Sequence, residues 1–76
     1  MQAYILINVE QGKEQEIYEE LLNLPEVSGA HLIFGEWDLI AKIKLDSSKD
    51  ELGTFILDKI RPMNGVSMTS TLIIAK

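Results

Sequence analysis

The residues best suited to chemistry form one short run, Gly35-Glu36-Trp37-Asp38. Either carboxylate could hold an ammonium group through charge-assisted hydrogen bonds, and the uncovered amides around Gly35 could hold a carboxylate. Trp37 could cover the apolar part of a small molecule or anchor a contact between subunits. The run therefore predicts a small-ligand site, with one alternative. In that alternative Asp38 only caps the turn and Trp37 anchors an interface without a ligand.

His31 is the only histidine, and the chain has no cysteine. Disulfides, thiolate ligands and a metal site built from several histidines are therefore not expected within one chain, and we predict no cofactor. We interpret His31 as a hydrogen-bonded interface residue rather than a catalyst. An enzyme would have to use His31 with Tyr4 or Asp38, and no nucleophile–base pair is visible beside them.

With 76 residues, the chain is expected to form one domain, 1–76. A chain this short buries only about 60% of the surface its unfolded form exposes, so self-association is the expected route to stability. The formal net charge is -5, and the basic residues are scattered, which argues against direct nucleic-acid binding. No apolar run approaches the ~20 residues of a membrane span, and no signal sequence is recognisable, so we expect a cytoplasmic protein.

The elements that must position the turn are its two flanking apolar runs, which have the length and branched composition of strands. Residues 27–34 and 39–45 therefore predict a β-hairpin, with Gly35 in its connection at positive φ and Gly29 at a bend or bulge. The other expected elements are a strand at 3–9, a helix at 13–23, a second helix opening at the capping-box motif Ser48-Lys49-Asp50-Glu51 and reaching Ile60, and a strand at 66–75.

This βαββαβ order predicts an α+β, ferredoxin-like sandwich, in which two helices cover one face of a four-stranded antiparallel sheet. Strand alternation predicts which side chains occupy the open face. A contiguous apolar patch on a soluble protein usually marks an interface, so we expect dimerisation through that face. Its expected members are Tyr4, Leu6, His31, Ile33, Ile40 and Ile73.

Along nearly its whole length the chain resembles the effector-binding RAM domain of the Lrp/AsnC (feast/famine) regulators. The matching stretches are Ala-Tyr-Ile-Leu-Ile-Asn-Val-Glu-Gln-Gly-Lys, Leu-Pro-Glu-Val, Phe-Gly-Glu-Trp-Asp-Leu-Ile-Ala-Lys-Ile, Gly65-Val66 and Thr69-Ser70-Thr71-Leu72-Ile73-Ile74. Two departures stand out. Trp37 replaces the more usual tyrosine, which puts the pocket size in doubt. The N-terminal helix-turn-helix is missing, so DNA binding is not carried over and the chain resembles a stand-alone version.

The resemblance implies a homodimer that assembles into a ring of dimers, expected to be an octamer or decamer. Small effectors, usually amino acids, bind such domains in clefts between dimers. The positions carried over to the cleft are Gly35, Glu36, Trp37, Asp38, Thr69, Ser70 and Thr71.

The leading hypothesis is a non-enzymatic domain for amino-acid binding and oligomerisation, which could modulate full-length Lrp/AsnC-type regulators. Two alternatives stay open at this point. One is a small enzyme of the dimeric α/β-barrel type, which shares the fold and the sheet-to-sheet dimer. The other is a purely structural oligomer.

Overall fold

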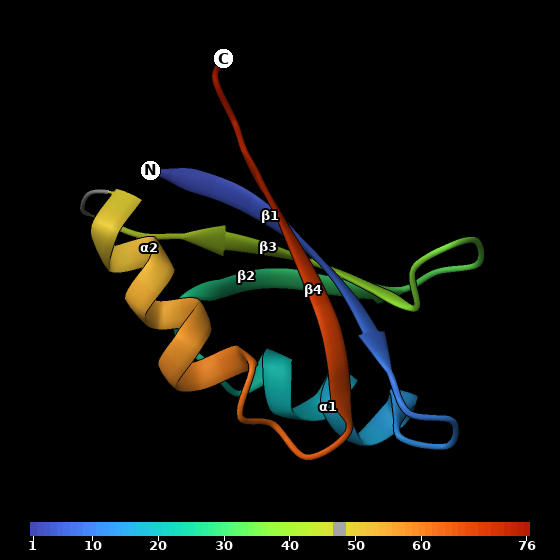
Figure 1. Ribbon diagram of the computed structural model, residues 1–76. Coiled ribbons are helices and arrows are strands. Elements are labelled where there is room, and N and C mark those ends of the chain that lie inside the picture. Colours follow the sequence, from blue (N-terminus) through green and yellow to red (C-terminus); the bar gives the residue numbers. More distant parts are fainter. Residues whose placement is uncertain (47–48) are drawn as a thin grey trace.

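The computed structural model describes residues 1–46 and 49–76 of the chain, with the side chains of 49 and 50 left undescribed. Its elements follow the predicted βαββαβ order (Figure 1). They are β1 (Gln2–Val9), α1 (Glu14–Leu22), β2 (Val27–Leu32), β3 (Leu39–Lys44), α2 (Lys49–Phe55), the π-helical segment η1 (Ile56–Ile60) and β4 (Val66–Ile73).

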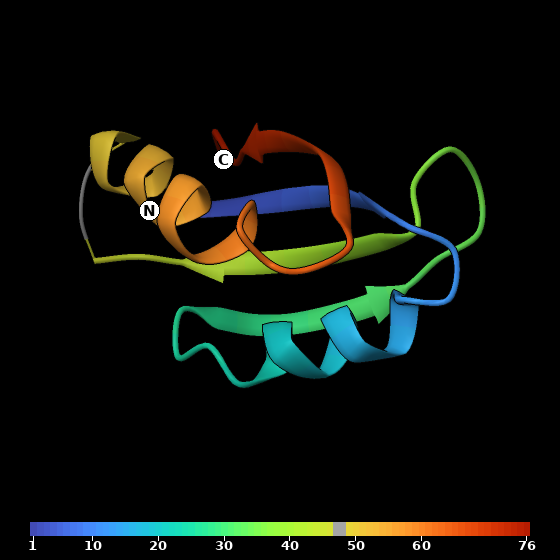
Figure 2. The ribbon, with the colours of Figure 1, turned by 60° about the horizontal axis from the view of Figure 1, so that its bottom comes forward.

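The four strands form one antiparallel sheet in the order β2-β3-β1-β4. Both helices lie on the same face, α1 over the β2 side and α2 over the β1 side (Figure 2). The predicted ferredoxin-like fold is therefore confirmed. None of the helices in the described ranges has the length and apolar content needed to cross a bilayer.

The core lies between the sheet and the helices, and strand alternation explains its composition. Ile5 in the centre of β1 is fully buried, as are Ile17 and Leu21 of α1. Elsewhere in α1, Tyr18 is half-buried and Leu22 is exposed. The buried apolar set as a whole comprises Ala3, Ile5, Ile7, Ile17, Leu21, Ala30, Leu39, Ala41, Ile43, Leu52, Phe55, Ile56 and Ile60.

The second helix differs from a regular α-helix in its last five residues, which form the π-helix η1. Its buried side chains are Leu52, Phe55, Ile56 and Ile60, whereas Lys59 is exposed. The capping box expected at Ser48 to Glu51 cannot be assessed, because Ser48 and the side chains of 49 and 50 lie outside the described residues.

The hairpin is confirmed, and its connection is longer than predicted. β2 ends at Leu32, two residues before the predicted end, so residues 33–38 form the connection to β3. Gly35 has a φ of 136°, which confirms the expected positive φ. The β2–β3 register shifts between Val27 and Gly29, which confirms the expected irregularity at Gly29.

The open face of the sheet is defined by the residues that alternate with the buried ones. Tyr4 pairs with Lys42, and Leu6 pairs with Ile40. His31 pairs with Ile40 from the other side. Directly opposite residues in an antiparallel ladder share a face, so Tyr4, Leu6, His31 and Ile40 lie on the open face, as predicted.

Two members of the predicted open-face set are placed differently. Ile73 pairs with Ala3, which is fully buried under the helices, so placing Ile73 on the open face was wrong. Leu72, paired with Tyr4, occupies that face instead. The prediction miscounted the alternation because β4 carries a register shift near its start, opposite Asn8 and Val9. Ile33 lies one residue beyond the end of β2.

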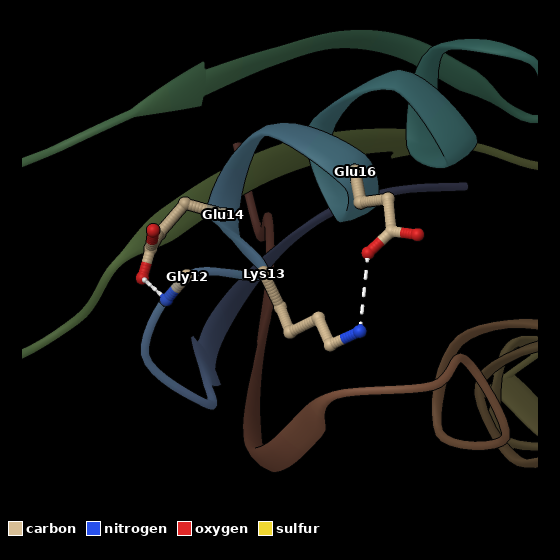
Figure 3. A network of polar contacts seen from close by, with 4 residues as sticks. All are labelled: Gly12, Lys13, Glu14 and Glu16. Atoms are coloured by element: carbon tan, nitrogen blue, oxygen red, sulfur yellow. Dashed lines mark hydrogen bonds and ion pairs between the residues drawn. The ribbon is translucent and has the colours of Figure 1, made fainter.

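Local bonds fix the turn that leads into α1. The amide of Gly12 donates to Glu14 Oε1 over 3.1 Å, and Lys13 Nζ lies 3.4 Å from Glu16 Oε2 (Figure 3). The amide of Glu10 donates to the carbonyl oxygen of Gly65 over 2.7 Å. The start of α1 is therefore held against the start of β4.

Candidate functional site

In the connection between β2 and β3, the residues at the tip are exposed and the residues at the end are half-buried. Phe34, Gly35 and Glu36 are exposed, and Phe34 is as accessible as in an extended chain, at 107%. A Cβ built on Gly35 would meet no atom within 4 Å, so positive φ and not crowding makes glycine suitable there. Trp37 and Asp38 are half-buried. The turn thus exposes the aromatic side chain of Phe34 and the carboxylate of Glu36.

Asp38 joins three segments through its backbone and side chain. Its amide donates to the carbonyl oxygen of Ile7 over 3.0 Å, and its own carbonyl oxygen accepts from the amide of Ile33 over 2.9 Å. Its Oδ2 accepts from the amide of Val9 over 2.9 Å. The carboxylate therefore extends the β1–β3 ladder beyond its last paired residues, which is the capping role that the sequence left open as an alternative.

We expect Asp38→Ala to lower the free energy of unfolding by about 1.5–3 kcal/mol, the usual value of a hydrogen bond to a charged group. Asp38→Asn keeps a side-chain oxygen that can accept from Val9, so its loss should be less than half as large. Urea unfolding at neutral pH measures both. Equal losses in the two variants would mean that the negative charge, not the acceptor oxygen, holds the turn.

The predicted hydroxyl residues of β4 do not share one face. Thr69 pairs with Ile7 and Thr71 with Ile5, both on the helix side of the sheet. Ser70 pairs with Leu6 and lies on the open face. Because strand side chains alternate, these three hydroxyls cannot line a single cleft from one side of the sheet.

The turn and β4 lie on opposite sides of β1. Leu39, which follows the turn, pairs with Ile7, and Ile7 pairs with Thr69. Leu39 and Thr69 are therefore separated by two strand spacings, about 10 Å. The structure therefore brings the two groups of predicted site residues to neighbouring positions in the sheet without direct contact.

Three hollows on the surface of the described residues lie away from the turn and from residues 69–71. The first has a volume of about 280 Å³ and lies between α2, η1 and the ends of two strands, beside Phe55 and Leu45. The second, of about 350 Å³, lies on the open face. The third, of about 360 Å³, lies beside Pro25 and Lys44. None of these three hollows corresponds to the predicted ligand cleft.

Sequence reasoning missed two features of potential functional importance. The full exposure of Phe34 was hidden because the residue continues the apolar pattern of β2. The open-face hollow is lined in part by Gly29, whose presence in a strand signalled only a bulge. Among the described residues, no group of three or more His, Cys, Asp or Glu side chains is placed to hold a metal ion.

Comparison with known proteins identifies the family. The family model described as the Lrp/AsnC ligand binding domain matches residues 2–76. The HTH-type transcriptional regulator FL11 of Pyrococcus horikoshii is 37% identical over 76 residues, a match that spans 100% of this chain and 49% of the regulator. The chain therefore spans about half the length of the curated regulators that it matches.

Solved structures show the same domain. The protein FFRP-DM1 is 45% identical with a TM-score of 0.90, and the match covers 96% of each chain. A transcriptional regulator from Neisseria meningitidis, solved as an L-Met complex, has a TM-score of 0.88 at 21% identity, covering 99% of this chain and 49% of that one. At that identity the second likeness concerns the fold alone. The family is one of regulatory ligand-binding domains and not of enzymes, and the chain belongs to it, as an Lrp/AsnC ligand-binding domain.

Proposed function

We propose that this domain binds a free amino acid at the Gly35–Asp38 turn and that the site is completed by a neighbouring copy of the chain. The observation that carries the proposal is the exposure of the turn. Phe34 is fully exposed, and the side chain of Trp37 is only half-buried. An aromatic ring left entirely in water gains nothing from folding, and such side chains are enriched where subunits meet.

The chemistry of the turn fits an amino acid. Asp38 Oδ2 accepts a hydrogen bond from the amide of Val9, and the second oxygen of a carboxylate can accept from an ammonium group. Glu36 is exposed beside it. The amides around Gly35 are uncovered, because that residue has no side chain. The Neisseria meningitidis structure with L-Met supports methionine as one of the first candidates, since the two chains share the fold.

The open face of the sheet supports assembly. Tyr4, Leu6 and Ile40 are half-buried there, and Met68 and Leu72 are 60% and 50% exposed. Pairing two such faces would remove this apolar surface from water, at about 25 cal/mol for each Å² buried. The proposed unit is a homodimer paired through its sheets, with further dimers meeting at the turns to form a ring. In this assembly the domain modulates full-length regulators of the same family by mixed oligomers.

The test is a thermal-unfolding screen of the twenty amino acids with wild-type protein and the variant Asp38→Asn. An amino acid present at 100 times its dissociation constant should add about 2.7 kcal/mol of apparent stability. We expect a response to at least one amino acid in the wild type and its loss in Asp38→Asn, which keeps the acceptor for Val9 but lacks the charge that holds the ammonium.

A second function, a purely structural oligomer, is favoured by one observation, namely that Asp38 already bonds to Val9. No response to any amino acid by an assembled wild-type protein would support that function and reject ligand binding. An equal response in Asp38→Asn would place the ligand away from the turn.

A further inference from the structure

The acidic side chains are confined to the helices and loops of the fold. All twelve Asp and Glu residues lie outside the four described strands. The strands contain only basic ionisable side chains besides Tyr4, namely His31, Lys42 and Lys44. Their register with Ile40, Tyr4 and Gln2 places them on the open face. A chain with a net charge of -5 therefore carries a cationic open face.

This face contains a hollow because one residue position on it has no side chain. Gly29 lies in register with Lys42 on the edge strand β2, immediately after the bulge at Ser28. A Cβ built on Gly29 would meet no atom within 4 Å. The resulting space has a volume of about 350 Å³, at the lower end of the roughly 300–1,000 Å³ usual for ligand pockets. It is lined by Tyr4, Ser28, Gly29, His31, Ile40 and Lys42.

The ammonium group of Lys42 is held at this hollow. Its Nζ lies 5.7 Å from the centre of the Tyr4 ring, within the range of a cation–π contact. Ser28 Oγ donates to the carbonyl oxygen of Lys42 over 3.3 Å, which ties the bulge to β3. Within the described residues, no carboxylate pairs with Lys42. Lys44 differs, because it lines a separate hollow together with Glu26 and Asp46.

We propose that the open-face hollow binds the carboxylate of a small organic acid. Lys42 supplies the positive charge, the side chains of Tyr4 and Ile40 contact the apolar part of the acid, and Gly29 provides the space. This site is separate from the Gly35–Asp38 turn.

The bound anion also has a role in assembly, a step that rests on the pairing of open faces proposed above. Pairing would bring Lys42 of two copies into a region with little water and no carboxylate from either sheet. An unpaired charge is costly to bury, and an opposite charge in hydrogen-bonding contact removes most of that cost. One carboxylate in each hollow would supply that opposite charge, so binding of the acid should strengthen dimerisation.

The experiment titrates benzoate, with benzamide as its uncharged analogue, into wild-type protein and three variants, followed by calorimetry in a low-salt buffer. Lys42→Met removes the charge, and Gly29→Val fills the hollow without changing any charge. Gly29 does not have positive φ, so valine introduces no backbone strain. Lys44→Met is the matched control, because it removes a lysine from the same strand and face. We expect benzoate to bind wild type and Lys44→Met with similar affinity. Its affinity for Lys42→Met and for Gly29→Val should be at least tenfold lower. Benzamide should bind none of the four proteins.

Equal binding of benzoate and benzamide, or undiminished binding of benzoate by Lys42→Met, would overturn the site. Sedimentation of the same samples separates this result from the proposed pairing. Dimers without benzoate binding would reject the site and leave the pairing intact. Monomers that bind benzoate would support the site and reject the pairing. A benzoate-dependent rise in the dimer fraction of wild type, absent in Lys42→Met, supports both.

Discussion

Replacing Gly65 with alanine should lower the free energy of unfolding by about 2–3 kcal/mol, at the upper end of the range for a residue forced into an unfavourable backbone region. Gly65 has a φ of 106°, which L-residues rarely adopt. A Cβ there would lie 2.8 Å from Lys13 Cγ and 2.9 Å from Lys13 Cβ. Because Lys13 Cβ is fixed to the backbone at the start of α1, relief requires the helix to move.

The control for this prediction is Gly53→Ala. Gly53 lies in α2, and an added Cβ would meet no atom within 4 Å. Alanine favours a helix over glycine by up to about 1 kcal/mol, so this variant should be more stable than wild type. Both are measured by chemical denaturation monitored by circular dichroism. A Gly65→Ala protein as stable as wild type would show that the turn at Gly65 and the start of α1 can move apart without a loss of stability.

Replacing Ile40 with lysine should lower the association constant of the proposed dimer at least 100-fold, equivalent to about 2.8 kcal/mol. Ile40 lies in the centre of the open face, paired with Leu6 on one side and His31 on the other. A lysine there would add a further cation to a face that already carries Lys42 and Lys44. Two-fold pairing would duplicate that charge across the interface, where removal from water makes it more costly.

Sedimentation velocity over a concentration series measures this effect. Leu57→Lys is the matched control, because Leu57 lies on η1, away from the open face, and is 58% exposed. We expect the control to sediment as wild type does and Ile40→Lys to remain monomeric at concentrations where wild type is dimeric. A dimer of unchanged strength in Ile40→Lys would move the interface to another surface.

The fold could be predicted from the sequence because its strands show strong patterns. Alternation in Leu39-Ile40-Ala41-Lys42-Ile43 identified the buried and open faces of β3 correctly. The positive φ of Gly35 followed from its place in a short connection between two strands. Patterns of this kind depend on neighbours in the chain, and the structure confirms them.

The errors arose where backbone pairing overrides the local pattern. Ile73 was placed on the wrong face because a register shift in β4 is determined by its partner β1 and not by its own residues. Phe34 continues the apolar run of β2 but lies beyond its end, since the paired residues of β2 and β3 end at Leu32 and Leu39. The π-helix at 56–60 has no recognisable signal in side-chain type.

The candidate site could be predicted only in part. The turn was identified from its residue types, and Asp38 was expected either to bind a ligand or to cap; the bond to Val9 shows that it does cap. Thr69 and Thr71 lie on the opposite face of the sheet from Ser70. These faces are set by the register of β4 with β1, which the sequence does not specify. The hollow at Gly29 depends on three adjacent strands, so no single stretch of sequence could reveal it.

The separation of acidic helices and loops from a basic sheet means that total charge is a poor guide to what this molecule attracts. Fields in physiological salt decay over about 8 Å, while packed layers lie on the order of 10 Å apart. A solute that reaches the molecule from the sheet side therefore experiences lysine and histidine before the glutamates behind them. Direction of approach, more than isoelectric point, determines which molecules are drawn in.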